Sequence, residues 1–456
     1  MSAFDPNWDK GARELAVEIL SRVERRNAYA GILLDHSLKG PPLSNLDRAL
    51  LTQLVYGTLR WRGRLDWLLS QVLRRPLSGT SPYLRNLLRL TLYQILFLDR
   101  VPDYAAVNEG VELAKKWGGK RSGDLINGVV RRVLRERDRL RFPSADDDLV
   151  RYLAIYWSHP DWLVKRWLGY FGRAETELLL QANNVESPLI LRANRLKNNR
   201  NDLLEVFRKA GVDAAPTSWS PQGIQVRGSS PVDRLSGFHE GLFQVQGEAS
   251  QLVGYLLDPK PGERILDACA APGGKSTHLA ELMGDEGEIV ATDISTRGLE
   301  KVKKNVQRLG ITSARYYLAD VTNGLEGPLA GPYDRILVDA PCSGLGTLRS
   351  HPEAKWHRGE EDISRLSRLQ KKILRGICPY VKSGGTLVYA TCTLTREENE
   401  GVVEDFLDCQ RDFVLEDAGQ HLPQEARELS FGNFFLALPY KHNTDGFFAA
   451  RMRKVE

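Results

Sequence analysis

The sequence has few cysteines, and their spacing is not that of a disulfide framework or a zinc site. The 456 residues include five, at positions 269, 342, 378, 392 and 409. Their number is odd and no two of them form a C-x-x-C pair, which argues against both kinds of site. We therefore expect a protein that holds no metal.

Long apolar runs are also missing. No stretch approaches the roughly 20 apolar residues that a membrane-spanning helix needs. The opening residues, MSAFDPNWDK, lack the basic and then apolar order of a secretory signal. With 42% hydrophobic and 27% charged residues, the composition is that of a globular protein. We expect a cytoplasmic protein with no membrane partner.

Positive charge is concentrated in the first third of the chain. Residues 1–141 contain 25 Lys and Arg against 15 Asp and Glu, whereas the remainder contains 38 against 43. Such an excess attracts an anionic partner such as nucleic acid. A solvated helical surface would account for it equally well.

The hydrophobic pattern divides the chain into three parts. In residues 1–141, apolar residues recur every three or four positions between Gly- and Pro-containing breakers, which predicts a helical bundle. Residues 142–235 begin with a linker, FPSADDD, and predict a small α/β module containing the strand PLILRAN. Residues 236–456 alternate strands with helices, which is typical of an α/β Rossmann-like domain with a parallel sheet.

The expected elements of this third part follow from short apolar runs and from amphipathic segments. The predicted strands are 264–270, 288–294, 314–320, 333–340 and 385–392, with a last one in GFFAARMR; the predicted helices are 275–283, 296–309 and 361–379.

A nucleoside-binding crevice is predicted where several of these strands end. Gly273 and Gly274 form a turn between a strand and a helix, which lets a ligand approach the backbone and the helix N-terminus. Asp293, Asp320 and Asp339 end the next three strands. Ligands of open α/β sheets bind at the carboxyl ends of the strands. A single Asp would be read as a helix cap or turn residue, but the set together with the glycine turn favours a ribose-containing ligand.

The turn does not match the sequence that binds a pyrophosphate. It reads AAPGGK, whereas dinucleotide enzymes have G-x-G-x-x-G. A cofactor with ribose and adenine but no phosphate fits better, and S-adenosyl-L-methionine is one.

Two cysteines follow neighbouring strands of the predicted sheet. Cys342 comes after the strand that ends at Asp339, and Cys392 ends the next strand. A thiolate at such a position can add to C6 of a pyrimidine and make C5 nucleophilic, which is covalent catalysis. A lone cysteine is more often a small buried hydrophobe, and we expect that of Cys378 and Cys409.

Several motifs resemble those of the RNA cytosine-C5 methyltransferase family. They are LDACAAPGGKSTHLAE, DAPCSGLGTLRSHPEAKW, LVYATCTLTREENE and TDGFFAARM. The first part, with LINGVVRRVL, resembles the NusB-like domain of the bacterial Sun/Fmu (RsmB) branch, and LILRANRLKNNRNDLLEVFRKAGV resembles its RNA-recognition-like module. The resemblance covers nearly the whole chain and implies methylation of a cytosine in 16S rRNA, using S-adenosyl-L-methionine.

The resemblance also implies roles for the residues of the site. Cys392 would be the nucleophile, and Cys342 would assist product release. Asp339 would act at N3 of the cytosine, while Lys275 would polarise the base or steady Asp339.

The cofactor would lie along the turn and the ends of the strands. By the resemblance, Cys269, Ala270, Ala271, Pro272, Gly273, Gly274 and Lys275 would hold its methionine and adenosine portions. Asp293 would take the ribose and Asp320 the adenine, with Asp339 on the same rim. One departure from the family is Gly247, where an Asp is usual, and Glu248 is the candidate replacement.

A basic loop after Cys342, RSHPEAKWHR, is read as a substrate loop. Arg349, Lys355 and Arg358 would face RNA phosphates, and an ordinary surface loop is the equal alternative.

Three other functions compete with this interpretation. An RNA-binding assembly factor without turnover would not need both cysteines and Asp339. An NAD-dependent oxidoreductase is disfavoured by the turn sequence. A tRNA methyltransferase would share all the chemistry, and only the N-terminal part points to rRNA. We expect a monomer.

Overall fold

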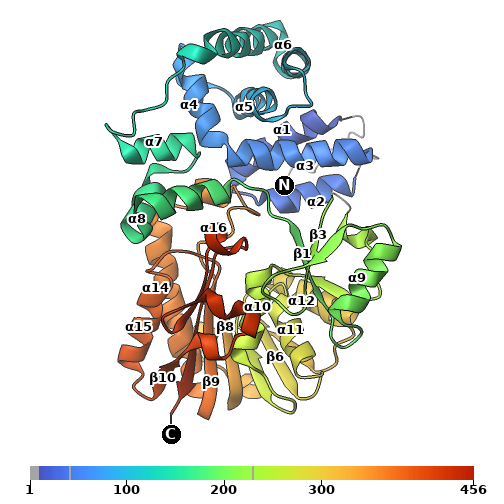
Figure 1. Cartoon of the computed structure of the whole chain (residues 1–456), viewed down its shortest axis with the longest axis vertical. Coiled ribbons are helices and arrows are strands. Elements are labelled where there is room, and N and C mark those ends of the chain that lie inside the picture. Colours follow the sequence, from blue (N-terminus) through green and yellow to red (C-terminus); the bar gives the residue numbers. More distant parts are fainter. Residues whose placement is uncertain (1–9, 41–42, 229–230, 456) are drawn as a thin grey trace. The chain divides into compact units, whose positions relative to one another are not determined.

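The chain divides into two compact units. The computed structural model describes residues 10–40, 43–228 and 231–455. One unit comprises Met1–Val185 and Leu348–Arg358, and the other comprises Glu186–Thr347 and Gly359–Glu456 (Figure 1). The sequence-based boundaries at 141 and 235 differ from this division, because helices beyond residue 142 belong to the first unit. The predicted helical part also includes residues 1–9 and 41–42, and the α/β module includes 229–230; these lie outside the described residues.

In its described residues the first unit contains helices and no strands, as its apolar spacing predicts. Ser44 and Ser81 begin two of the helices, each accepting a hydrogen bond from a backbone N–H of the first turn. The continuous pattern of 46–73 is interrupted at Trp61 and forms two helices. The helices are α1 (Ala12–Arg26), α2 (Ala30–Leu38), α3 (Asn45–Arg60), α4 (Arg62–Val72), α5 (Pro82–Phe97), α6 (Asp103–Glu136), α7 (Leu149–Tyr156), α8 (Asp161–Asn183) and α13 (Ala354–His357).

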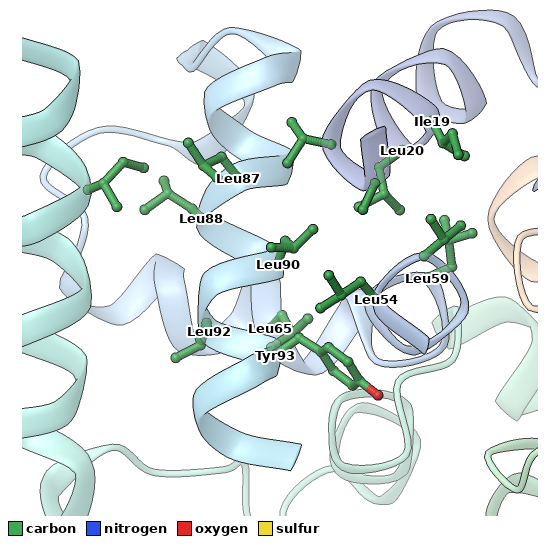
Figure 2. Packing of buried hydrophobic residues seen from close by; sticks show 14 of the residues in the cluster. Ile19, Leu20, Leu54, Leu59, Leu65, Leu87, Leu88, Leu90, Leu92 and Tyr93 are labelled. Atoms are coloured by element: carbon green, nitrogen blue, oxygen red, sulfur yellow. The ribbon is translucent and has the colours of Figure 1, made fainter. Parts of the chain in front are cut away.

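Helix α5 is the central helix of the unit's hydrophobic core. Leu87, Leu88, Leu90 and Leu92 lie on different sides of it, and all are almost completely buried (Figure 2). A helix with buried side chains on several sides must be surrounded by other helices. Contacts with α1, α3 and α6 provide that surrounding.

The second unit begins with a small antiparallel sheet. Its strand order is β2 (Ala214–Pro216), β3 (Gly223–Val226), β1 (Leu189–Ala193) and β4 (Phe243–Val245). Helix α9 (Arg200–Lys209) packs Leu203 and Phe207 against Leu191 and Ile224 of this sheet. The structure confirms the predicted small α/β module.

The large sheet of this unit combines parallel and antiparallel strands. Its order is β11-β12-β13-β9-β8-β5-β6-β7, and β10 also pairs with β13. Strands β7, β6, β5, β8 and β9 are parallel, whereas β13 is antiparallel to β9. The strands are β5 (Arg264–Asp267), β6 (Glu288–Asp293), β7 (Ala314–Leu318), β8 (Tyr333–Asp339), β9 (Val381–Thr391), β10 (Phe413–Glu416), β11 (Ser430–Phe431), β12 (Phe434–Ala437) and β13 (Phe447–Lys454).

Helices cover both faces of the large sheet, so its central strands are apolar on both sides. On β8, Leu337 joins the core formed with α10 (Glu248–Leu257), α11 (Gly274–Leu282) and α12 (Thr296–Leu309). The neighbouring Ile336 and Val338 join the opposite core, formed with α14 (Glu360–Ile377) and α15 (Glu400–Cys409). Side chains alternate between faces along a strand, and this accounts for the unbroken apolar run.

A buried ion pair connects the small sheet to helix α11, which covers one face of the large sheet. Arg192 of β1 and Glu281 of α11 both have fully buried side chains, and Arg192 Nη2 lies 2.6 Å from Glu281 Oε1. The guanidinium also donates to the backbone oxygen of Gly274 at 2.7 Å and to Thr277 Oγ1 at 3.1 Å. These bonds compensate the cost of burying both charges.

Within the described ranges, no helix combines the length and the apolar character that crossing a membrane would require.

Replacing Arg192 by Met should destabilise the second unit strongly. The change leaves the Glu281 carboxylate buried without its partner, which typically costs about 3–5 kcal/mol. The double variant R192M/E281M should recover most of the loss, because it removes both charges. Urea unfolding of the variants measures the effect.

The exposed pair formed by Arg208 and Glu205 provides the control. R208A should leave the free energy of unfolding nearly unchanged, because an exposed ion pair contributes little. Equal losses in R192M and R208A would contradict the assignment.

Candidate active site

The two cysteine-bearing turns lie side by side at one edge of the large sheet. Strands β8 and β9 pair in parallel, with Asp339 opposite Ala390. Each strand then turns, and the turns carry Cys342 and Cys392. The two Sγ atoms are 3.3 Å apart, and both side chains are only partly buried. The thiols therefore face a common space.

The close approach of the two sulfurs opposes ionisation at Cys342. The pKa of Cys342 is raised well above its ordinary value, first by its hydrogen bond with Cys392, then by burial and by the charges of Cys392 and Glu398. Two sulfurs this close do not readily hold two negative charges. Cys342 thus keeps its proton when Cys392 is a thiolate.

An ion pair lies beside the cysteines. Lys275 Nζ, from the first turn of α11, donates to Asp339 Oδ2 at 2.5 Å. The ammonium also lies over the ring of Phe447, 5.1 Å from its centroid. The lysine thereby orients the Asp339 carboxyl group at the end of β8, three residues before Cys342.

The glycine turn between β5 and α11 has the shape that the sequence predicts. Gly273 has φ 98°, and a Cβ there would lie 3.0 Å from the Cα of Val302. Around Gly274 the nearest atom to an added Cβ is 4.0 Å away. The space beside Gly274 is therefore open, and the first N–H groups of α11 have no partner within the helix, as at any helix N-terminus.

Asp293 and Asp320, which follow the turn in the sequence, accept hydrogen bonds within the protein and are still partly or fully exposed to solvent. Asp293 Oδ2 accepts from Ala271 N at 3.1 Å, and its Oδ1 accepts from Ser295 N at 2.8 Å. Asp320 is exposed and caps a short helical turn by accepting from Thr322 N. Both carboxylates retain lone pairs with which to accept ribose or adenine groups.

Cys269 has a different environment from the paired cysteines. Its pKa is raised well above the ordinary value, by desolvation first and then by the charges of Asp267 and Asp339. A thiol held in its protonated form is not a nucleophile, so its position fits a packing and backbone role in the turn.

These residues suit a nucleoside cofactor that lacks phosphates. The turn offers N–H groups, Asp293 and Asp320 offer acceptors, and the charge of Lys275 is already paired with Asp339. In the portion of the chain that the structure describes, no group of three or more His, Cys, Asp or Glu residues could hold a metal ion.

Gly247 stands where the family usually has an Asp, and Glu248 does not provide a free carboxylate in its place. Glu248 is buried, and its Oε1 accepts from Trp219 N at 2.6 Å and from Ser220 N at 3.0 Å. These bonds hold the loop between β2 and β3. A Cβ at Gly247 would lie 3.5 Å from Asp445 Oδ2.

The prediction that the basic loop presents Arg349 and Lys355 to phosphates is wrong in this structure. Arg349 is 5% exposed and Lys355 is 1% exposed. Lys355 Nζ donates to the backbone oxygen of Arg60 at 3.0 Å, and burial lowers its pKa well below the ordinary value. Trp356 and Glu353 of the same segment also bond to the helical unit, so the loop is part of that unit's interior. Arg358 is half-buried.

Sequence reasoning missed two buried residues around the site. Arg192 reaches the backbone of the glycine turn, and Glu398 lies under the cysteine turns. No spacing or motif links residue 192 to residue 274. The expectation for Cys409 is also wrong, because that thiol is exposed, whereas Cys378 is buried as predicted.

Family models match all three parts of the chain. Residues 254–453 match the model described as 16S rRNA methyltransferase RsmB/F. Residues 10–135 match the NusB family, and residues 159–233 match the ferredoxin-like domain of RsmF/B-like methyltransferases.

Relatives of nearly the same length are found in several bacteria. The probable ribosomal RNA small subunit methyltransferase B of Synechocystis sp. is 40% identical over 445 residues, which is 97% of this chain and 99% of the relative. The protein of the same name from Bacillus subtilis is 38% identical over 97% and 98% of the two chains. Ribosomal RNA small subunit methyltransferase B of Escherichia coli O7:K1 is 36% identical over 98% and 99%.

Solved structures share the architecture. The protein PH0851 superposes with a TM-score of 0.83 and 27% identity, covering 98% of this chain and 99% of its own. A methyltransferase homolog from Pyrococcus horikoshii gives a TM-score of 0.58 and 30% identity over 68% of this chain and 99% of its own.

Buried Asp267, at the end of β5, should make the stability of the protein depend on pH. Burial raises its pKa from 3.8 to about 7, against the opposing hydrogen bond from Ser276. The folded state therefore binds this proton more tightly, and the contribution present below about pH 4 is lost as the pH rises to about 7. Three pKa units correspond to about 4 kcal/mol at most.

Replacement of Asp267 by Asn should remove this dependence. Relative to D267N, the wild type should lose free energy of unfolding between about pH 4 and pH 7 in urea titrations. Parallel curves for the two proteins over that range would show that the carboxyl group does not titrate as described.

Proposed function

This chain belongs to the 16S rRNA methyltransferase RsmB/F family, and from that premise we propose that it methylates C5 of a cytosine in 16S rRNA through a covalent cysteine adduct. The observation that supports the proposal is the 3.3 Å approach of Cys342 Sγ and Cys392 Sγ beside the pair formed by Lys275 and Asp339. A binding protein without turnover would not need this arrangement.

Cys392 is the nucleophile in this proposal. C5 of cytosine is too weak a nucleophile to take a methyl group directly. Addition of the Cys392 thiolate to C6 forms a C–S bond and converts the ring to an enamine with a nucleophilic C5. One difficult step is thereby divided into two easier ones.

Asp339 and Lys275 act on the opposite side of the pyrimidine ring. The ring gains negative charge toward N3 when the thiolate adds to C6. Asp339 is ionised in its pair with Lys275, so it must take up a proton when the cytosine binds; as a neutral carboxyl group it can then donate a hydrogen bond at N3, which lowers the barrier. Lys275 holds that carboxyl group in place through its bond to Oδ2 and supplies a nearby positive charge.

Cys342 serves as the base that ends the reaction. After methyl transfer, removal of the C5 proton lets the C6–S bond break and returns Cys392 as a thiolate. While Cys392 is bound to carbon, it has neither a thiol proton nor a negative charge. The hydrogen bond and the charge of Cys392 then no longer raise the pKa of Cys342, whereas burial and Glu398 still do, so Cys342 ionises more readily than in the free protein and can take the proton.

S-adenosyl-L-methionine is the proposed cofactor, and when bound it would supply an electrophilic methyl group on sulfur. Residues 269–275 would hold its methionine and adenosine portions. Asp293 would accept hydrogen bonds from the ribose, and Asp320 would lie toward the adenine. The open space beside Gly274 and the partly exposed Asp293 support this assignment.

The RNA substrate would be bound mainly through its phosphates. The excess of Lys and Arg over Asp and Glu in residues 1–141 supports sequence-tolerant contacts with rRNA. The target cytosine must leave its stack to reach a thiol at the end of a strand. We propose that one copy of the chain carries the whole active site and acts as a monomer.

Replacing Cys392 by Ala should abolish methyl transfer to 16S rRNA, because no adduct can form. Replacing Cys342 by Ala should leave the adduct unresolved and accumulate a protein–RNA species that survives denaturing gels. Transfer of labelled methyl groups and gel mobility measure these effects. C409S, at an exposed thiol, is the matched control and should behave as the wild type.

The opposite pattern of trapping would reverse the roles of the two cysteines. If C392A retained full transfer to C5, the covalent route would be wrong. Bisulfite sequencing of rRNA from cells that lack the gene locates the cytosine.

A further inference from the structure

A fully buried carboxylate lies beneath the two cysteine turns. Glu398 is 0% exposed and belongs to the turn between β9 and α15. A carboxylate in such a place is tolerated only when hydrogen bonds replace its water. Its partners therefore identify what the residue holds in place.

Both oxygens of Glu398 bond to the residue that follows Cys342. Oε1 accepts from Ser343 N at 2.9 Å, and Oε2 accepts from Ser343 Oγ at 2.6 Å. Gln370 Nε2 donates to Oε1 at 3.0 Å, and Thr395 Oγ1 donates to Oε2 at 2.8 Å. Four hydrogen bonds thus surround one carboxylate.

The same network reaches the residue that follows Cys392. Ser343 Oγ lies 2.7 Å from Thr393 Oγ1. Since the serine hydroxyl donates to Glu398, the threonine hydroxyl donates to the serine. The residues after the two cysteines are therefore joined directly to each other and through Glu398.

Two backbone–backbone hydrogen bonds join the cysteine turns, one on each side of Cys342. Ala340 N donates to Ala390 O at 2.8 Å before Cys342, and Gly346 N donates to Cys392 O at 2.9 Å after it. The part of the turn between these two bonds carries the Sγ atom of Cys342. Glu398 bonds to this middle part.

Glu398 is itself anchored on the side of Cys392. Tyr389 donates its hydroxyl to Glu398 O at 2.6 Å. The adjacent Asn399 bonds to Thr391 Oγ1 and to Thr393 O. The carboxylate is thus fixed to one cysteine turn and extends to the other.

We propose that Glu398 is a positioning residue that sets the distance between the Cys342 and Cys392 thiols for the two stages of the reaction. This inference rests on the proposed roles of the two cysteines. Glu398 does not touch the substrate in this proposal, because its carboxylate is enclosed by the four donors.

The charge of Glu398 has a second consequence. It is one of the groups that raise the pKa of Cys342, after the hydrogen bond with Cys392, burial and the charge of Cys392. The same carboxylate that fixes the position of Cys342 also favours its protonated form. Glu398 thereby supports the proposed difference in role between Cys342 and Cys392.

A dithiol reagent tests the distance without relying on methyl transfer. Phenylarsine oxide forms two As–S bonds with neighbouring thiols, and its oxygen leaves as water with the two thiol protons. The wild type should capture one equivalent in a reaction that needs both Cys342 and Cys392, as mass spectrometry of C342A and C392A would show.

Replacing Glu398 by Gln keeps the size of the side chain but removes its charge and one acceptor. Capture of the arsenical should slow by about tenfold or more, and kcat for rRNA methylation should fall similarly with KM for rRNA unchanged. Alkylation of Cys342 by iodoacetamide should begin at a lower pH, because the negative charge is gone. E397Q, at the exposed neighbouring residue, should match the wild type.

A stability measurement keeps the outcomes separate. Unfolding midpoints of E398Q and E398A are compared first, so that only folded variants are scored. A folded E398Q that captures the arsenical and methylates rRNA at wild-type rates would overturn the positioning role. If the wild type captures the arsenical and E398Q does not, but neither methylates rRNA, the positioning role stands and the proposed function fails.

Discussion

The parallel pairing of β8 and β9 is the constraint on which the chemistry of this protein depends. Asp339 lies opposite Ala390, so both strands end at the same edge of the sheet and their cysteine turns begin side by side. A shift of one residue in this register would separate the turns and direct the apolar side chains of a strand to the wrong faces. The approach of the two sulfurs is thus fixed by the same pairing that forms the core.

Buried charged side chains hold in place the turns that follow the paired strands. Arg192 holds the glycine turn from the small sheet, and Glu398 joins the two cysteine turns from below. Each charged group meets several hydrogen-bonding partners, which makes its burial tolerable and its geometry specific. The site therefore combines partly exposed reactive groups with fully enclosed supports. Rigid supports keep the reactive groups in place before the substrate binds.

Sequence reasoning succeeded where local pattern controls structure and failed where distant contacts do. The central strands were predicted to within a few residues, because apolar runs bounded by glycine and proline have few alternatives. Lys355 was expected at the surface, since a lysine in a loop is seldom buried. Its actual environment is created by Arg60 and the helical unit, far away in the chain. No local pattern carries that information.

The amino-acid sequence by itself determined most of the helices of the first unit and the central strands of the large sheet, together with the glycine turn and the placing of Asp339, Cys342 and Cys392 at or just after strand ends. These features depend on residues within a few positions of one another, such as the alternation of apolar side chains along a strand. Only the tertiary structure decided that the two sulfurs lie 3.3 Å apart and that Arg192 and Glu398 support the turns. Such contacts join residues that are distant in sequence, and they exist only when the whole sheet and its covering helices pack together.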